Sequence, residues 1–303
     1  MRNFILLLGL LVTVASGNLS ARAGVETETG SHSERNTSAK TFVWRIAKSG
    51  ELQGYLVGSL HLLPSNAYPL DPAYKQAFDR ADVLAFEANY DRLQRRTPQL
   101  IQRLGLYPRG ETLQQNLPPK TFQQLTQLAQ RIGLPKARLQ RMEPWLASTV
   151  ITVQLAQQAG YSPKLGLDRH FFNQAKQAGK PRKAFESPKQ QFQLLDGLSQ
   201  SQQAELLAHE LDKVRQSMAA LVQAWKQGDA AALERILEKE FRQKAPEVYR
   251  RVIVERNRTW MDDIRTLLAQ EDTPLIVVGA GHVVGDRGLA TKLRERGYTL
   301  QRR

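Results

Sequence analysis

The chain has 303 residues, of which 41% are hydrophobic and 24% are charged, and its formal net charge is +14 at pH 7. This composition is typical of a globular protein with a proper core, and it excludes a largely disordered chain. The sequence contains no cysteine, which excludes disulfides, cysteine nucleophiles and metal sites built from thiolates.

The excess of positive charge favours anionic partners or surfaces. A protein that binds nucleic acid usually concentrates its basic residues on one surface and interleaves them with aromatic residues. Here Lys and Arg are scattered along the chain, and aromatic residues make up only 7% of it. We therefore predict a solvated basic surface and no nucleic-acid partner.

The first 40 residues are predicted to lie outside the folded domain. Residues 1–23 combine an early arginine, an apolar run and an Ala-x-Ala cleavage pattern, which together indicate a signal peptide. The apolar run is shorter than the about 20 residues that span a bilayer, so cleavage is favoured over a retained anchor. Residues 24–40 are polar and predict a flexible lead-in. The mature chain is expected in the periplasm or outside the cell, without a membrane span.

The folded part begins with a predicted β-hairpin. Phe42–Ile46 alternates apolar and polar residues, Ser49 and Gly50 form a turn, and Gly54–Gly58 returns as the partner strand. A helix from Asp71 to about Arg80 follows, started by an acidic cap and a proline, and Ala81–Phe86 is the next strand.

From about residue 93 to residue 270 the pattern is mostly helical and predicts a large insertion. A short strand at Pro181–Phe185 interrupts it, and a buried apolar strand at Pro274–Val278 follows it. The pattern predicts one α/β domain over residues 41–303, with a mixed central β-sheet and a large helical insertion. The remaining predicted elements are helices at 120–132, 144–160, 167–178, 201–226, 230–239, 247–268 and 289–296, and an edge strand at 298–300.

Four ionisable residues share one position relative to the predicted strands. His61, Glu87, Glu186 and His282 each follow the end of a strand, and each histidine stands three residues after a glycine. Ligands of open α/β sheets bind beyond the carboxyl ends of the strands, so we expect these side chains to meet. Two histidines and two carboxylates suit Zn²⁺, Mn²⁺ or Co²⁺, and one glutamate could instead be a general base. Taken singly, each residue fits a structural role equally well.

Two other residues have both a structural and a functional interpretation. Asp168 opens a predicted helix, where its negative charge favours the helix dipole, and we prefer this role to that of a ligand. Arg256 pairs with a carboxylate of the site, clamps an anionic group of the substrate, or forms a purely structural salt bridge.

The order and spacing of the motifs resemble the TraB/GumN family, which is related to the TIKI-type metalloproteases and, more distantly, to erythromycin-esterase-like hydrolases. The resemblance implies an active site made of His61, His282 and Glu87, with a divalent metal as in the TIKI-type members. Glu186 and the pair Arg256–Asn257 match further positions of the family, and we assign the pair to substrate binding. The segments that carry the resemblance are Gly58–Pro64, Ala81–Glu87, Glu143–Trp145, Gly166–Asp168, Phe185–Ser187 with Gln191, Arg256–Asn257 and Val278–Gly285.

The sequence thus predicts a metal-dependent hydrolase, most simply a metallopeptidase, that acts on a peptide or small-molecule substrate. His61 and His282 would bind the ion, with Glu87 and Glu186 as ligand and base in either order. One alternative is a metal-independent, esterase-like hydrolase that uses a histidine as general base. Another is a non-catalytic periplasmic protein that binds haem or a metal. The oligomeric state is left open.

Overall fold

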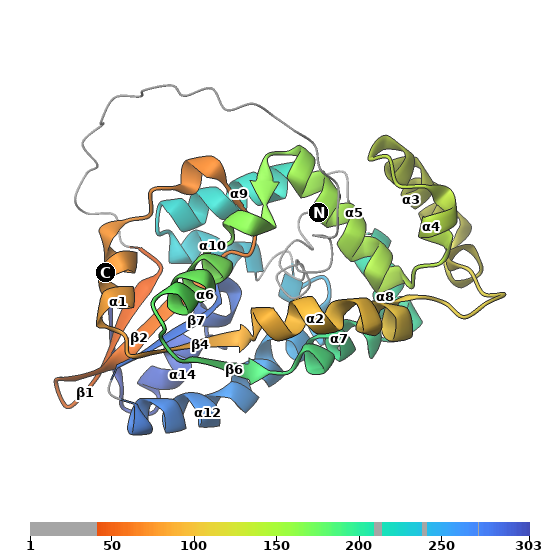
Figure 1. The fold of residues 1–303 in the computed structure, drawn as a ribbon. Helices are drawn as coiled ribbons and strands as arrows, with labels where there is room; N and C mark the ends of the chain where they lie inside the picture. The colour runs from red at the N-terminus through yellow and green to blue at the C-terminus, as the bar shows by residue number, and fades with distance from the viewer. Residues whose placement is uncertain (1–40, 209–213, 238–240, 272) are drawn as a thin grey trace.

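The computed structural model describes residues 41–208, 214–237, 241–271 and 273–303 (Figure 1). The predicted signal peptide and the predicted lead-in therefore lie outside the described residues. Within the described part of the chain, no helix is both long and apolar enough to cross a membrane.

The core is a six-stranded sheet in the order β6-β4-β7-β2-β1-β8. The first four strands of this order run parallel, whereas β1 is antiparallel to both β2 and β8. The prediction of an α/β protein with a mixed sheet is thus confirmed. The strands are β1 (Val43–Lys48), β2 (Glu51–Ser59), β4 (Val83–Ala88), β6 (Arg182–Glu186), β7 (Pro274–Gly279) and β8 (Thr299–Arg302), and a separate two-stranded sheet pairs β3 (Leu63–Pro64) with β5 (Tyr161–Ser162).

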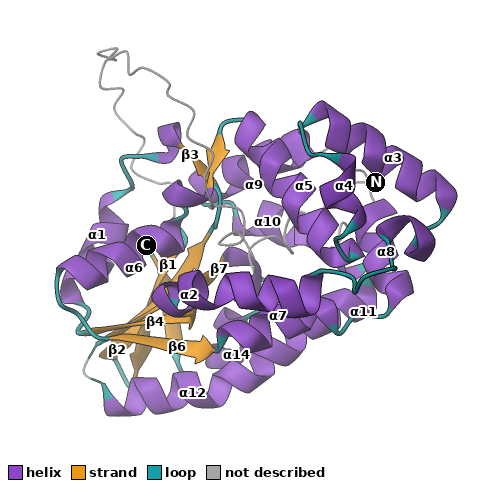
Figure 2. Ribbon diagram, turned by 45° about the vertical axis from the view of Figure 1, so that its right-hand side comes forward, coloured by secondary structure: helices purple, strands orange, loops and turns teal. Residues whose placement is uncertain are grey.

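Helices cover both faces of the sheet (Figures 1 and 2). Helix α6 (Leu167–Gln177) packs on β4, β6 and β7 from one side, and α12 (Arg256–Gln270) packs on β2 and β7 from the other. Because both faces are covered, the central strand β7 is apolar along nearly its whole length, and its first five residues are buried.

The remaining helices lie mostly at one end of the sheet, and Figure 1 shows α3 and α4 farthest from it. The predicted helices at 120–132, 144–160 and 167–178 are found within two residues of their predicted ends as α3, α5 and α6. Besides α6 and α12, the described α-helices are α1 (Pro72–Arg80), α2 (Tyr90–Leu100), α3 (Pro119–Arg131), α4 (Lys136–Gln140), α5 (Pro144–Gln158), α7 (Pro188–Asp196), α8 (Gln200–Ala208), α9 (Val214–Lys226), α10 (Ala230–Leu237), α11 (Pro246–Tyr249), α13 (Ala280–Val283) and α14 (Leu289–Arg294).

Two elements differ from their prediction in a way that affects the site. The helix predicted at 247–268 is divided, because a π-helical segment, Arg250–Glu255, separates α11 from α12. Such segments are frequent at functional sites, and Arg256 comes directly after this one. Strand β4 ends at Ala88 and not at Phe86, so Glu87 lies within the strand. Pairing of Ala88 with Glu186 of β6 extends the strand past the polar residue.

The parallel strands end at one edge of the sheet, and this edge collects the candidate residues. Ser59 at the end of β2 pairs with Gly279 at the end of β7, and Ala88 at the end of β4 pairs with Glu186 at the end of β6. The residues that follow these strands are therefore neighbours in space even where they are far apart in the chain.

Candidate functional site

A close backbone contact positions His61. A Cβ atom added to Gly166 would lie 2.4 Å from the carbonyl oxygen of His61, so only glycine lets the two backbones approach this closely. The next residue, Leu167, donates its backbone N–H to the carbonyl of Leu60 at 3.0 Å. This contact brings Asp168, in the first turn of α6, to His61, whose Nδ1 donates to Asp168 Oδ2 at 2.9 Å.

The bond to Asp168 determines the protonation of His61. With the proton on Nδ1, the lone pair of the neutral imidazole is on Nε2. Burial lowers the pKa of His61, but the charge of Asp168 and its hydrogen bond outweigh burial and raise this pKa above its usual value of 6.5. Nε2 lies 3.9 Å from Glu87 Oε1, too far for a hydrogen bond, and the side chain is 14% exposed. Part of the His61 side chain is therefore open to solvent.

Glu87 is a buried carboxylate that is held ionised. Its Oε1 accepts the backbone N–H of Gly279 at 2.7 Å, and its Oε2 accepts from Arg256 Nη2 at 2.7 Å. Burial alone would raise the pKa of Glu87, but the charge of Arg256, followed by the electrostatic contributions of the two nearby imidazoles and the Gly279 hydrogen bond, lowers it to about 2. So low a pKa makes Glu87 a weak base at neutral pH.

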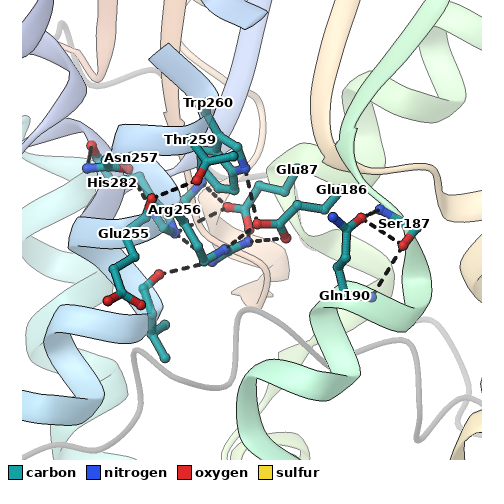
Figure 3. Close-up of polar contacts among 12 residues, drawn as sticks. Glu87, Glu186, Ser187, Gln190, Glu255, Arg256, Asn257, Thr259, Trp260 and His282 are labelled. Carbon is teal, nitrogen blue, oxygen red and sulfur yellow. Dashed lines mark hydrogen bonds and ion pairs between the residues drawn. The ribbon is translucent and has the colours of Figure 1, made fainter. Parts of the chain in front are cut away.

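Arg256 lies at the centre of the cluster (Figure 3). Its Nε and Nη2 donate to the two oxygens of Glu186 at 2.7 and 2.9 Å, and Nη2 also donates to Glu87. Its Nη1 donates to His282 Nε2 at 2.9 Å and to the carbonyl of Val252 at 3.3 Å. A guanidinium group has five N–H donors, and all five are used here.

His282 is neutral and is held from both sides. Its Nε2 accepts from Arg256, and its Nδ1 donates to Asn257 Oδ1 at 2.8 Å, an assignment that follows from the hydrogen-bond network. Burial, and then the charge of Arg256, lowers the pKa of His282 to about 3. The amide of Asn257 donates to the carbonyls of His282 and Arg287, so the buried Asn257 side chain orients His282.

Two functional neighbours were not identified as such in the sequence. Trp260 donates its Nε1 to Glu186 Oε1 at 3.1 Å, its ring centroid lies 4.6 Å from that of His282, and the Arg256 guanidinium lies over its ring. Trp260 stands one helical turn after Arg256, and this spacing is the only feature of the sequence that points to Trp260. Asp168 was interpreted as a helix-dipole residue, although it is also the partner of His61.

The glycine of the second Gly-x-x-His motif keeps the centre of the cluster open. A Cβ atom on Gly279 would lie 3.2 Å from Glu87 Oε1 and 3.5 Å from His61 Nε2. An alanine at this position would therefore crowd the space between these two side chains.

The four residues predicted as metal ligands come together, but their arrangement does not fit a ligand set. Glu87, Glu186 and the Nε2 of His282 accept hydrogen bonds from Arg256, whose charge would repel a divalent cation placed among them. Across the described residues, no group of three or more His, Asp or Glu side chains is arranged to hold a metal ion. The roles of these four residues as metal ligands stay predictions.

Comparison with known proteins gives the family. The model of the TraB/PrgY/gumN family matches residues 42–302. The uncharacterized protein YbaP of Shigella flexneri is 24% identical over 252 residues, which are 82% of this chain and 90% of that protein. YbaP of Escherichia coli (strain K12) shows the same identity and coverage. No solved structure matches the chain. Because the family match covers almost all of the folded chain, the protein belongs to the TraB/PrgY/gumN family.

Proposed function

We propose that the protein is a hydrolase that acts without a metal ion, with His61 as its general base. The observation that carries the proposal is the pair His61–Asp168, which leaves Nε2 of His61 without a hydrogen-bond partner among the described residues, in a side chain that is 14% exposed. Arg256 donates hydrogen bonds to both glutamates and to His282, so these groups are already bonded within the protein. This supports a metal-free hydrolase over the metal-dependent peptidase that the sequence predicts. An ester is the simplest substrate for such a base.

The proposed reaction begins with a water molecule beside His61. Nε2 removes a proton from this water as its oxygen attacks the acyl carbon of the ester. The bond between the acyl carbon and the leaving oxygen then breaks, and His61 returns the proton to the leaving alkoxide, which gives a carboxylic acid and an alcohol. Positioned proton transfer of this kind contributes about 10²–10⁴-fold to a rate.

Asp168 and Glu87 stabilise the imidazolium that forms during this step. Asp168 is bonded to its Nδ1, and the ionised Glu87 carboxylate lies 3.9 Å from its Nε2. Arg256 keeps Glu87 ionised, which makes Arg256 a positioning residue. Since all its N–H donors are used within the protein, this arrangement offers none to a substrate. The predicted substrate-binding role of Arg256 and Asn257 stays a prediction.

Chelation tests the proposal directly. The mature protein is dialysed against EDTA, its metal content is measured by elemental analysis, and initial rates are followed on a panel of para-nitrophenyl esters and fluorogenic peptides. We expect ester hydrolysis at an unchanged rate and no stoichiometric metal. Loss of activity on chelation, restored by Zn²⁺, Mn²⁺ or Co²⁺, would establish the metal-dependent hydrolase instead.

Replacement of Asp168 by asparagine should shift the pH dependence of the reaction. A general base works in its neutral form, so the rate is expected to rise with pH through the raised pKa of His61. Without the charge of Asp168, this pKa falls, and the half-maximal rate moves to lower pH while kcat decreases. The measurement is kcat/KM across pH for both proteins. Asp262→Asn, which changes an exposed aspartate of α12, is the matched control. An unshifted profile would remove Asp168 from the mechanism.

We also propose that the protein acts in the periplasm or outside the cell. The signal-like composition of residues 1–23 supports this location.

A further inference from the structure

Three arginines form one exposed face of helix α2. Arg92, Arg95 and Arg96 follow the spacing i, i+3 and i+4, which places them side by side on the helix, and all three are exposed. Leu93 and Thr97 are buried on the other face. Like charges at this spacing repel one another and weaken the helix, so local stability does not account for the pattern.

These arginines and Pro188 line a cavity of about 340 Å³. Pro188 is the first residue of α7, and α7 packs against α2. The N-terminus of a helix carries a partial positive charge, so α7 adds to the positive potential of the arginines. We call this cavity the arginine pocket.

Among the described residues, no acidic side chain pairs with the arginines of the pocket. In the part of the chain that the structure describes, the side chains of Arg92 and Arg95 form no ion pair, and Arg96 donates only to the neutral amide of Gln99. The neighbouring acid, Asp91, is bonded to Lys176 at 2.9 Å. The guanidinium groups of the pocket are therefore available to an external anion.

The arginine pocket lies at the same edge of the sheet as the candidate site. Helix α2 begins directly after β4, which carries Glu87, and Pro188 is two residues after Glu186 at the end of β6. Figure 2 shows α2 and α7 next to each other beyond the ends of these strands. The arginine pocket is therefore built on the two helices that directly follow the strands carrying Glu87 and Glu186.

We infer that the arginine pocket binds an anionic group of the substrate, so that the substrate is a small ester bearing a carboxylate or a phosphate. Guanidinium groups match the two oxygens of such an anion with paired hydrogen bonds. That the substrate is an ester rests on the proposed function. That the protein binds an anion rests only on the arginine pocket.

Anion binding is tested first, without any reaction. Succinate and inorganic phosphate are titrated into the mature protein by calorimetry at low ionic strength. The double variant Arg92→Gln/Arg95→Gln should bind the anion about tenfold more weakly. The control is Arg109→Gln/Arg138→Gln, which removes the same charge from exposed positions outside the pocket and should bind like the wild type. Equal binding by all three proteins would overturn the inference.

Kinetics with a matched pair of substrates link the pocket to the reaction. The pair is para-nitrophenyl acetate, which is neutral, and mono-para-nitrophenyl succinate, which carries a carboxylate. In the double variant, KM should rise about tenfold for the succinate ester and stay unchanged for the acetate. An equal effect on both esters would contradict the inference. If neither ester is hydrolysed, the proposed function fails, and the calorimetric result alone decides whether the pocket binds anions.

Discussion

Replacement of His61 by glutamine should lower kcat by about 10²–10⁴-fold, because it removes the group that takes the proton from the attacking water. Glutamine is close to histidine in size and can keep a hydrogen bond to Asp168, so the fold should be retained. The measurement is kcat and KM on the best ester of the panel, together with the far-ultraviolet circular dichroism spectrum and the melting temperature.

His170→Gln is the matched control, because His170 lies on the same helix as Asp168 and is only partly buried. Its activity should equal that of the wild type. His282→Gln helps to separate the metal-dependent mechanism from the metal-free one. If His61 and His282 were metal ligands, both His61→Gln and His282→Gln would release a bound metal ion. A folded His61→Gln protein that keeps its activity would refute the role of His61 in either mechanism.

Replacement of Arg256 by methionine should lower the free energy of unfolding by about 3–5 kcal/mol at neutral pH. Methionine retains much of the side-chain volume but leaves the carboxylates of Glu87 and Glu186 without their counter-charge, and Arg256 itself is only 4% exposed. The measurement is denaturant-induced unfolding of both proteins. Arg258→Met, an exposed arginine on the same helix, is the control and should change stability little.

The pH dependence of this loss gives a second readout. In the wild type the pKa of Glu87 is lowered to about 2 from 4.5, so its stabilising contribution is present above pH 4.5 and is lost as the pH falls through about 2. Without Arg256, burial dominates and raises this pKa, so Glu87 in the variant becomes protonated at higher pH. The difference in stability between the two proteins should therefore narrow as the pH is lowered from 7 toward 4.5. A difference in unfolding free energy that does not change with pH would show that the buried carboxylates are not its cause.

Much of the fold could be predicted from local patterns. The apolar run Pro274–Val278 predicted a buried strand, and it is the central strand β7. Phe42–Ile46 and Gly54–Gly58 predicted a hairpin, and β1 and β2 form it. Such predictions succeed because burial and turn formation act over a few residues, which sequence periodicity reports directly. The strand β4 was placed two residues too early, because its extension to Ala88 depends on pairing with β6.

The partner of His61 was not predictable in the same way. Asp168 is separated from His61 by 107 residues, and the two meet only because Gly166 allows its segment to lie against the backbone of His61. A sequence shows an acidic residue at the start of a helix, and the helix dipole explains it without any distant partner. Only the packing of α6 on the sheet reveals the second role.

Local burial patterns are enough to place His61, Glu87, Glu186 and His282 at the ends of core strands. Because parallel strands end at one edge of a sheet, the same patterns predict that these side chains are neighbours. The groups that lie among them are visible only in the folded protein: the guanidinium of Arg256 lies between them, Asp168 is bonded to His61, and Asn257 is bonded to His282. The physical reason is that strand ends follow from local burial, whereas hydrogen-bond partners depend on how distant helices pack against the sheet, and that packing determines which charges and lone pairs remain available for chemistry.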